Sequence, residues 1–97
     1  MMIKKVIASL VLLGATQAHA SDTLCVSIAE LAYNTAEARD HGASFGDIMS
    51  VIYEDRSQPM HVRVIVTRVV DRSYHADMTP AATSSYMYDW CMLTVGD

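Results

Sequence analysis

Residues 24–42 read LCVSIAELAYNTAEARDHG, and this stretch decides the fold. Apolar and small residues recur in it at spacings of three and four, which places them on one face of a helix: Leu24, Cys25, Ile28, Leu31, Ala32, Thr35 and Ala38. Arg39 and His41 stand in the last turn, where cations suit the helix dipole. Gly42 follows as the residue that ends a helix in a left-handed turn. The stretch predicts a helix over residues 22–41.

The residues before this helix predict export. Residues 1–20 read MMIKKVIASLVLLGATQAHA, with two lysines, a largely apolar run over 6–14 and a small-x-small end. This is the layout of a bacterial secretory signal peptide. The apolar run is too short for a spanning helix, which needs roughly 20 residues, and Ser21 stands where a lipoprotein needs cysteine. We expect cleavage after residue 20, a periplasmic or secreted domain over 21–97, and no membrane anchor after cleavage.

This compartment decides the role of the only two cysteines, Cys25 and Cys91. The expected domain has 77 of the 97 residues, and a domain of this size has a marginal core that usually needs a staple. A disulfide that closes so long a loop contributes roughly 4 kcal/mol in the chain-entropy model. Neither a C-x-x-C motif nor metal-ligand spacing surrounds the cysteines. We therefore expect a structural disulfide between them rather than a redox or metal-binding pair.

A second helix is marked by its first residues. Ser44 is followed three residues later by Asp47, which resembles a capping box with Asp in place of Glu or Gln. An apolar stripe follows and reaches Ile52. The pattern predicts a short helix that ends near residues 54–56.

Residues 57–74 fit two structures. Pro59 suits the start of a helix, and Val62, Val66 and Val69 follow a helical period. The β-branched, partly alternating run over 62–67 is instead typical of a strand. A single strand would have no pairing partner, because no other segment has strand character. The context therefore favours a helix, and a strand is the alternative.

A last helix is expected to begin at Thr79 and Pro80, which suit the N-cap and first helical positions. We expect it to end near residue 93, with a frayed tail over 94–97. The chain is thus predicted to form a single all-α domain of about four short helices. The disulfide joins the first helix to the last.

Several of these residues together carry a resemblance to a known group of proteins. They are Cys25, the run Ala38-Arg39-Asp40-His41-Gly42, Ser44, Tyr74, Thr79-Pro80 and the final Tyr88-x-x-Cys91. The pattern resembles small exported bacterial and phage proteins with an early Cys, an A-R-x-x-G helix end and a late Cys. In size and cysteine placement the chain is also similar to phage lysozyme inhibitors of the spackle type. The first resemblance implies helices and a disulfide, and it implies no catalytic residue.

The charge of the expected domain argues against two classes of partner. Loss of residues 1–20 removes both lysines and leaves five arginines against eleven acidic residues, a formal charge of −6 in place of −4. Nucleic acids and anionic membranes are bound through concentrated positive charge. We therefore expect no nucleic-acid partner.

The sequence contains no recognisable catalytic or metal-binding motif. The histidines at 41, 61 and 75 form no H-x-x-x-H pair, and no G-x-S-x-G or glycine-rich phosphate loop is present. We predict no enzymatic activity, no cofactor and no metal site. Two alternatives stay open: a small periplasmic metal or ligand binder that uses Met and His, and an enzyme with an unrecognised site.

Three aromatic residues in the last helix suggest a binding surface. Tyr86, Tyr88 and Trp90 alternate along the chain, and one core-facing stripe of a helix cannot bury all three. Tyrosine and tryptophan are enriched in protein interfaces. We expect these residues to contact a partner protein of the cell envelope. The predicted function is that of an exported, non-enzymatic interaction protein, an inhibitor or a regulator.

Overall fold

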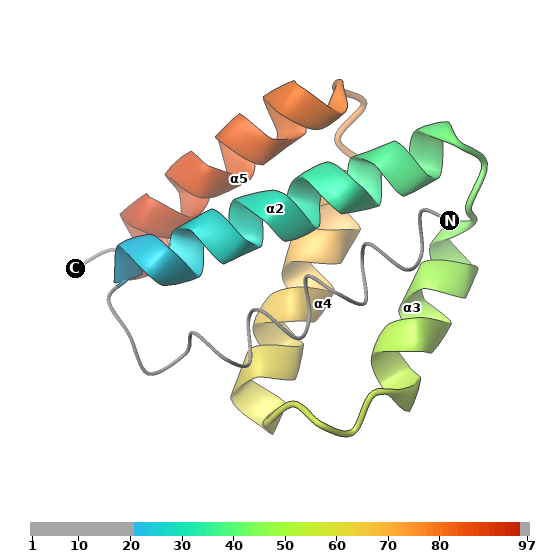
Figure 1. Ribbon diagram of the computed structural model, residues 1–97, viewed down its shortest axis with the longest axis horizontal. Coiled ribbons are helices and arrows are strands. Elements are labelled where there is room, and N and C mark those ends of the chain that lie inside the picture. The colour runs from blue at the N-terminus through green and yellow to red at the C-terminus, as the bar shows by residue number, and fades with distance from the viewer. Residues whose placement is uncertain (1–20, 96–97) are drawn as a thin grey trace.

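The computed structural model describes residues 21–95, and the predicted signal peptide at 1–20 lies outside the described residues, as do 96–97. The described chain forms four helices: α2 (Ser21–Asp40), α3 (Phe45–Glu54), α4 (Met60–Tyr74) and α5 (Pro80–Val95) (Figure 1). No strand occurs between residues 21 and 95. The all-α prediction is confirmed. Within the same range, no helix has both the length and the hydrophobicity that crossing a bilayer requires.

The helices pack in two layers, one formed by α2 and α5 and the other by α3 and α4 (Figure 1). Helices α2 and α5 lie side by side and run in opposite directions, α4 crosses beneath them, and α3 packs against α4 (Figure 1). A disulfide links Cys25 on α2 to Cys91 on α5, with a Cα–Cα distance of 5.5 Å. The predicted disulfide between the first and last helices is therefore confirmed. It joins the beginning of α2 to the C-terminal part of α5.

The predicted apolar face of α2 forms the centre of the core. Cys25, Ile28, Leu31 and Ala32 are fully or almost fully buried, with exposed fractions of 0–1%. Facing residues from the three other helices complete the cluster: Ile48, Met49, Ile52, Val62, Val66, Val69, Val70, Met87 and Cys91. The core thus lies between α2 and α4 and is closed by α3 on one side and α5 on the other.

The helix ends follow the signals in the sequence. Gly42 has φ +95°, and the Ala43 N–H donates to the Ala38 carbonyl at 3.0 Å, which is the hydrogen bond of a Schellman motif. Ser44 Oγ accepts from the Asp47 N–H at 3.0 Å and caps α3. Thr79 Oγ1 accepts from the Ala82 N–H at 3.2 Å and caps α5 in the same way.

Residues 60–74 are helical, so the strand alternative is wrong. The buried residues of α4 lie on one helical face: Val62, Val66, Val69, Val70 and Ser73. Val64, which gave the segment its alternating pattern, is 49% exposed and lies off this face. Tertiary packing of one valine-rich stripe against α2 therefore overrides the β propensity of the run.

Helix α5 is longer than predicted. It continues to Val95, whereas the sequence placed its end near residue 93 and a frayed tail from residue 94. No glycine or proline follows Pro80 until Gly96, so nothing in the chain stops the helix earlier. The two additional residues amount to less than one helical turn.

Candidate functional site

The three aromatic residues of α5 do not form one exposed surface. Met87 is fully buried at the centre of the core face of α5, and its neighbours lie on both flanks of that face. Tyr86 is 46% exposed. Tyr88 and Trp90 pack against the core, and the guanidinium carbon of Arg72 lies 5.7 Å from the centroid of the Trp90 ring. Of the three, Tyr86 is the one that offers a large free surface to a partner.

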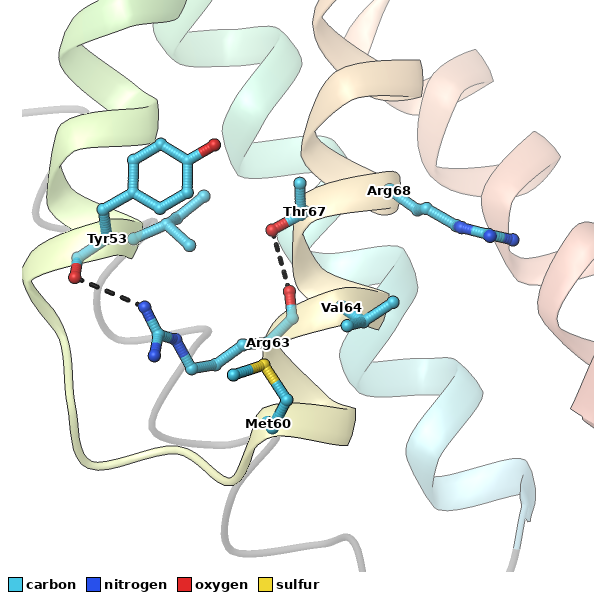
Figure 2. A pocket seen from close by; sticks show the side chains of 7 residues that line it. Tyr53, Met60, Arg63, Val64, Thr67 and Arg68 are labelled. Atoms are coloured by element: carbon cyan, nitrogen blue, oxygen red, sulfur yellow. Dashed lines mark hydrogen bonds between the residues drawn. The ribbon is translucent and has the colours of Figure 1, made fainter.

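A groove between α3 and α4 is lined by several exposed apolar or aromatic side chains. It has a volume of about 410 Å³ and lies between the C-terminal end of α3 and the first half of α4. Figure 2 shows the side chains around it. We call this hollow the α3–α4 groove and define it by six lining residues: Tyr53, Met60, Arg63, Val64, Thr67 and Arg68. The sequence did not predict it as a site.

Three apolar or aromatic side chains of the groove are unusually exposed. Tyr53 is 58% exposed, Met60 70% and Val64 49%. Single exposed apolar residues are normal on a protein surface, and here three of them gather around one concavity. Tyr53 comes from the last turn of α3 and Met60 from the first turn of α4, so the short connection between these helices brings them together.

The position of Val64 follows from the geometry of α4. The core face of this helix includes Val62 and Val66, and a residue two positions from each of them points about 200° away. Val64 therefore faces outward. Valine is a poorer helix former than alanine, glutamate or lysine, so an exposed valine here does not help the helix. A valine off the core face of the predicted helix is the feature of the sequence that could have pointed to the groove.

The groove carries positive charge in an otherwise acidic chain. Arg63 Nη2 donates to the main-chain carbonyl of Tyr53 at 3.4 Å, which holds the guanidinium at the end of α3. Arg68 makes no hydrogen bond or ion pair with any other described residue, and in Figure 2 it extends on the side of Val64 away from Tyr53. None of the acidic residues in the described part of the chain lines this groove.

The connection behind the groove is ordered by Asp55. Its carboxylate accepts hydrogen bonds from the hydroxyl and the main-chain N–H of Ser57. These two hydrogen bonds, followed by the positive charge of Arg63, hold the pKa of Asp55 below its ordinary value of 3.8. The ionised carboxylate thus helps to shape the turn between Tyr53 and Met60, which both line the groove.

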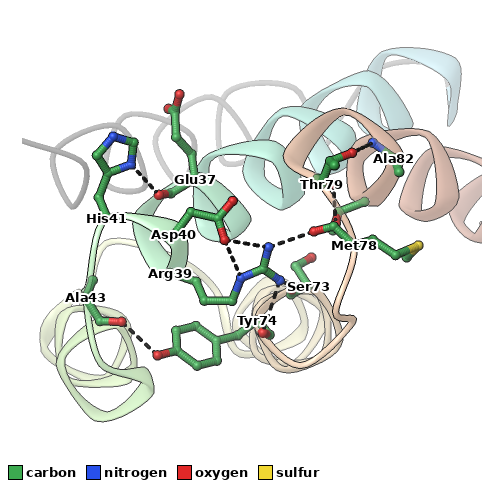
Figure 3. Close-up of polar contacts among 11 residues, drawn as sticks. Glu37, Arg39, Asp40, His41, Ala43, Ser73, Tyr74, Met78, Thr79 and Ala82 are labelled. Carbon is green, nitrogen blue, oxygen red and sulfur yellow. Dashed lines mark hydrogen bonds and ion pairs between the residues drawn. The ribbon is translucent and has the colours of Figure 1, made fainter.

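A second polar cluster has a structural role. Arg39 on α2 donates to the main-chain carbonyls of Ser73 and Tyr74, at 3.3 and 3.4 Å, and to that of Met78 at 2.7 Å (Figure 3). The Tyr74 hydroxyl donates to the Ala43 carbonyl at 2.7 Å. These contacts fasten the end of α4 to α2 and to the α2–α3 turn. Several residues that carry the resemblance to exported proteins therefore serve the fold.

The environments of the Met and His side chains bear on the metal-binding alternative. In residues 21–95, no three or more His, Cys, Asp or Glu residues are placed so as to hold a metal ion. Met49 and Met87 are buried in the core. The ring Nδ1 atoms of His41 and His75 lie 2.8 and 2.9 Å from main-chain carbonyls one turn earlier in the chain. No observation favours the metal-binding alternative.

The chain matches no known protein family, no curated protein and no solved structure in the comparisons made with each. Function is therefore inferred from the described residues. The α3–α4 groove offers apolar contact and two guanidinium groups, which suit the binding of another molecule.

Proposed function

We propose that this protein is an exported, non-enzymatic interaction protein that binds another protein of the cell envelope through the α3–α4 groove. One observation carries the proposal: Tyr53, Met60 and Val64 expose apolar surface around a single hollow of about 410 Å³ that two arginines flank. Tyrosine, methionine and arginine are enriched in protein interfaces. Bound to its partner, the protein acts as an inhibitor or a regulator.

The disulfide and residues 1–20 support the export part of the proposal. Disulfides persist in oxidising compartments and are rare in the cytosol, and this chain has its two cysteines paired. Residues 1–20 have the three-part layout of a signal peptide. Both features fit a protein that works in the periplasm or outside the cell.

Three exposed tyrosines allow a matched test of the binding surface. Tyr53 lines the groove, Tyr86 lies on α5 and Tyr33 on α2, with exposed fractions of 58%, 46% and 39%. Each is replaced in turn by the photoreactive analogue p-benzoyl-phenylalanine, in the full chain expressed in its host. After irradiation of intact cells, adducts are resolved by mass and identified by mass spectrometry.

We expect a discrete adduct with one envelope protein from Tyr53, and only background from Tyr33. An adduct from Tyr86 alone would move the binding surface to α5 and overturn the role of the groove. Background from all three positions would overturn the proposal that the protein binds a partner. For an identified partner, its activity with and without the purified protein then tests whether binding inhibits or regulates it.

A further inference from the structure

The charge of the α3–α4 groove is opposite to that of the chain. The whole sequence has eleven acidic and seven basic residues, and five of the basic residues, all arginines, lie outside residues 1–20. Two of these five, Arg63 and Arg68, line the groove, and no acidic residue from the described part of the chain does. A hollow with this local charge attracts negatively charged partners.

The two arginines have donors left for a partner. Arg63 gives one hydrogen bond to the Tyr53 carbonyl, and its charge also acts on the nearby Asp55 carboxylate, whereas a guanidinium carries five N–H donors. Arg68 has no partner among the described residues. By contrast, Arg39 is held by three carbonyls and by Asp40 at 2.9 Å. The groove therefore holds guanidinium groups that the fold itself leaves largely unused.

Apolar surface lies between the two charges. In Figure 2, Val64 separates Arg63, which lies below Tyr53, from Arg68, which extends to the other side. Arg63 and Arg68 are five positions apart on α4, so their side chains leave the helix axis roughly 140° apart, on either side of Val64. A helix of the partner therefore meets the two guanidinium groups with carboxylates on the two flanks of its apolar face, while an apolar residue between them meets Val64.

A helix is a form of partner that this surface can accept. One mode of peptide binding, the addition of a strand to a free sheet edge, needs a strand, and residues 21–95 contain none. A helix satisfies its own main-chain hydrogen bonds, so it needs only side-chain contacts from the groove. Its apolar face can lie against Tyr53, Met60 and Val64 in the manner of a helix in a groove.

We infer that the α3–α4 groove binds an acidic amphipathic helix of its partner, with apolar residues against Val64 and Met60 and carboxylates paired with Arg63 and Arg68. This inference rests on the proposed function and adds the chemistry of the segment that is recognised. Because the charges flank an apolar contact, the carboxylates position the helix and the apolar residues hold it.

A selection experiment tests this chemistry without knowledge of the partner. A phage-displayed library of random helical peptides is selected on the full chain, exported to the periplasm and purified in its disulfide-bonded form. We expect the enriched peptides to carry Asp or Glu three or four positions from a large apolar residue. Their affinity should fall at least about tenfold for Arg68→Gln and should weaken as salt is raised.

Two control variants locate the binding. Arg56→Gln removes the same charge from an exposed residue outside the groove, and we expect it to change affinity less than about twofold because exposed charges outside an interface contribute little. Val64→Glu places a like charge against the peptide, and we expect it to abolish binding. Equal losses for Arg56→Gln and Arg68→Gln would show a general charge effect and overturn the inference.

The remaining outcomes separate this inference from the proposed function. Enriched peptides that are neutral or basic, yet sensitive to Val64→Glu, would overturn the acidic helix and leave the groove as a binding surface. A library that yields no groove-binding peptide also overturns the inference, and crosslinking from Tyr53 then decides the proposed function. A dimer in analytical ultracentrifugation that Val64→Glu dissociates would identify a second copy of the chain as the occupant and overturn the inference.

Discussion

Arg39 on α2 donates a hydrogen bond of 2.7 Å from Nη2 to the main-chain carbonyl oxygen of Met78, 39 positions later in the chain. The same guanidinium also reaches the carbonyls of Ser73 and Tyr74 at the end of α4. One side chain thus satisfies carbonyls that a helix end leaves without internal partners. It also fixes the α4–α5 connection against α2.

Replacement of Arg39 by methionine should destabilise the fold. Methionine keeps most of the aliphatic stem but removes the donors to three carbonyls, and hydrogen bonds that involve a charged group contribute about 1.5–3 kcal/mol. We expect the free energy of unfolding, measured in urea, to fall by about 2–3 kcal/mol. The matched control is Arg56→Met, since Arg56 is exposed and makes no hydrogen bond or ion pair with the described residues. Equal losses for the two variants would contradict the role given to Arg39.

Removal of the disulfide should cost more stability than any other change proposed here. Cys25 and Cys91 are 66 positions apart and fully buried, and a loop of this length contributes roughly 4 kcal/mol through the entropy of the unfolded chain. We expect the double variant Cys25→Ala and Cys91→Ala to melt far below the wild-type protein, or to be unfolded at 37 °C. A melting temperature within a few degrees of the oxidised protein would show that the core is sufficient alone.

Asp55 should make the stability of the protein depend on pH in the acid range. Its pKa in the folded state lies below 3.8, mainly because Ser57 donates two hydrogen bonds to the carboxylate and secondarily because Arg63 is near. A lowered folded pKa gives stability that is present above the unfolded pKa and is lost as the pH falls through the folded pKa. Melting temperatures of the wild type and Asp55→Asn should therefore converge as the pH is lowered from about 6 to about 3. A constant difference over this range would contradict the assignment.

The features that were predicted from the sequence are local. The periodicity of residues 24–38 placed the face of α2, and Gly42, Ser44 and Thr79 marked helix ends because their capping hydrogen bonds join residues close in the chain. The disulfide was predictable because the chain has only two cysteines. Residues 62–67 were ambiguous because β-branched residues fit both a strand and one buried face of a helix.

The groove depends on tertiary structure, and for this reason the sequence did not locate it. Tyr53 and Val64 come from two helices, and their exposure depends on how α3 packs against α4. The sequence indicated that one face of α5 cannot bury all three of its aromatic residues. Which of them is exposed depends on the face by which α5 packs against α2. That residue is Tyr86, which is 46% exposed, whereas Tyr88 and Trp90 pack against the core.

The most direct test of the groove as a docking surface compares Val64→Glu with Val26→Glu. Both valines are on helices and about half exposed, at 49% and 54%, and glutamate is a better helix former than valine. We expect both variants to keep the wild-type free energy of unfolding within about 0.5 kcal/mol. The decisive measurement is the yield of the adduct from p-benzoyl-phenylalanine at Tyr53, which should be lost with Val64→Glu and kept with Val26→Glu. A folded Val64→Glu variant that forms the adduct at the wild-type yield would contradict the account.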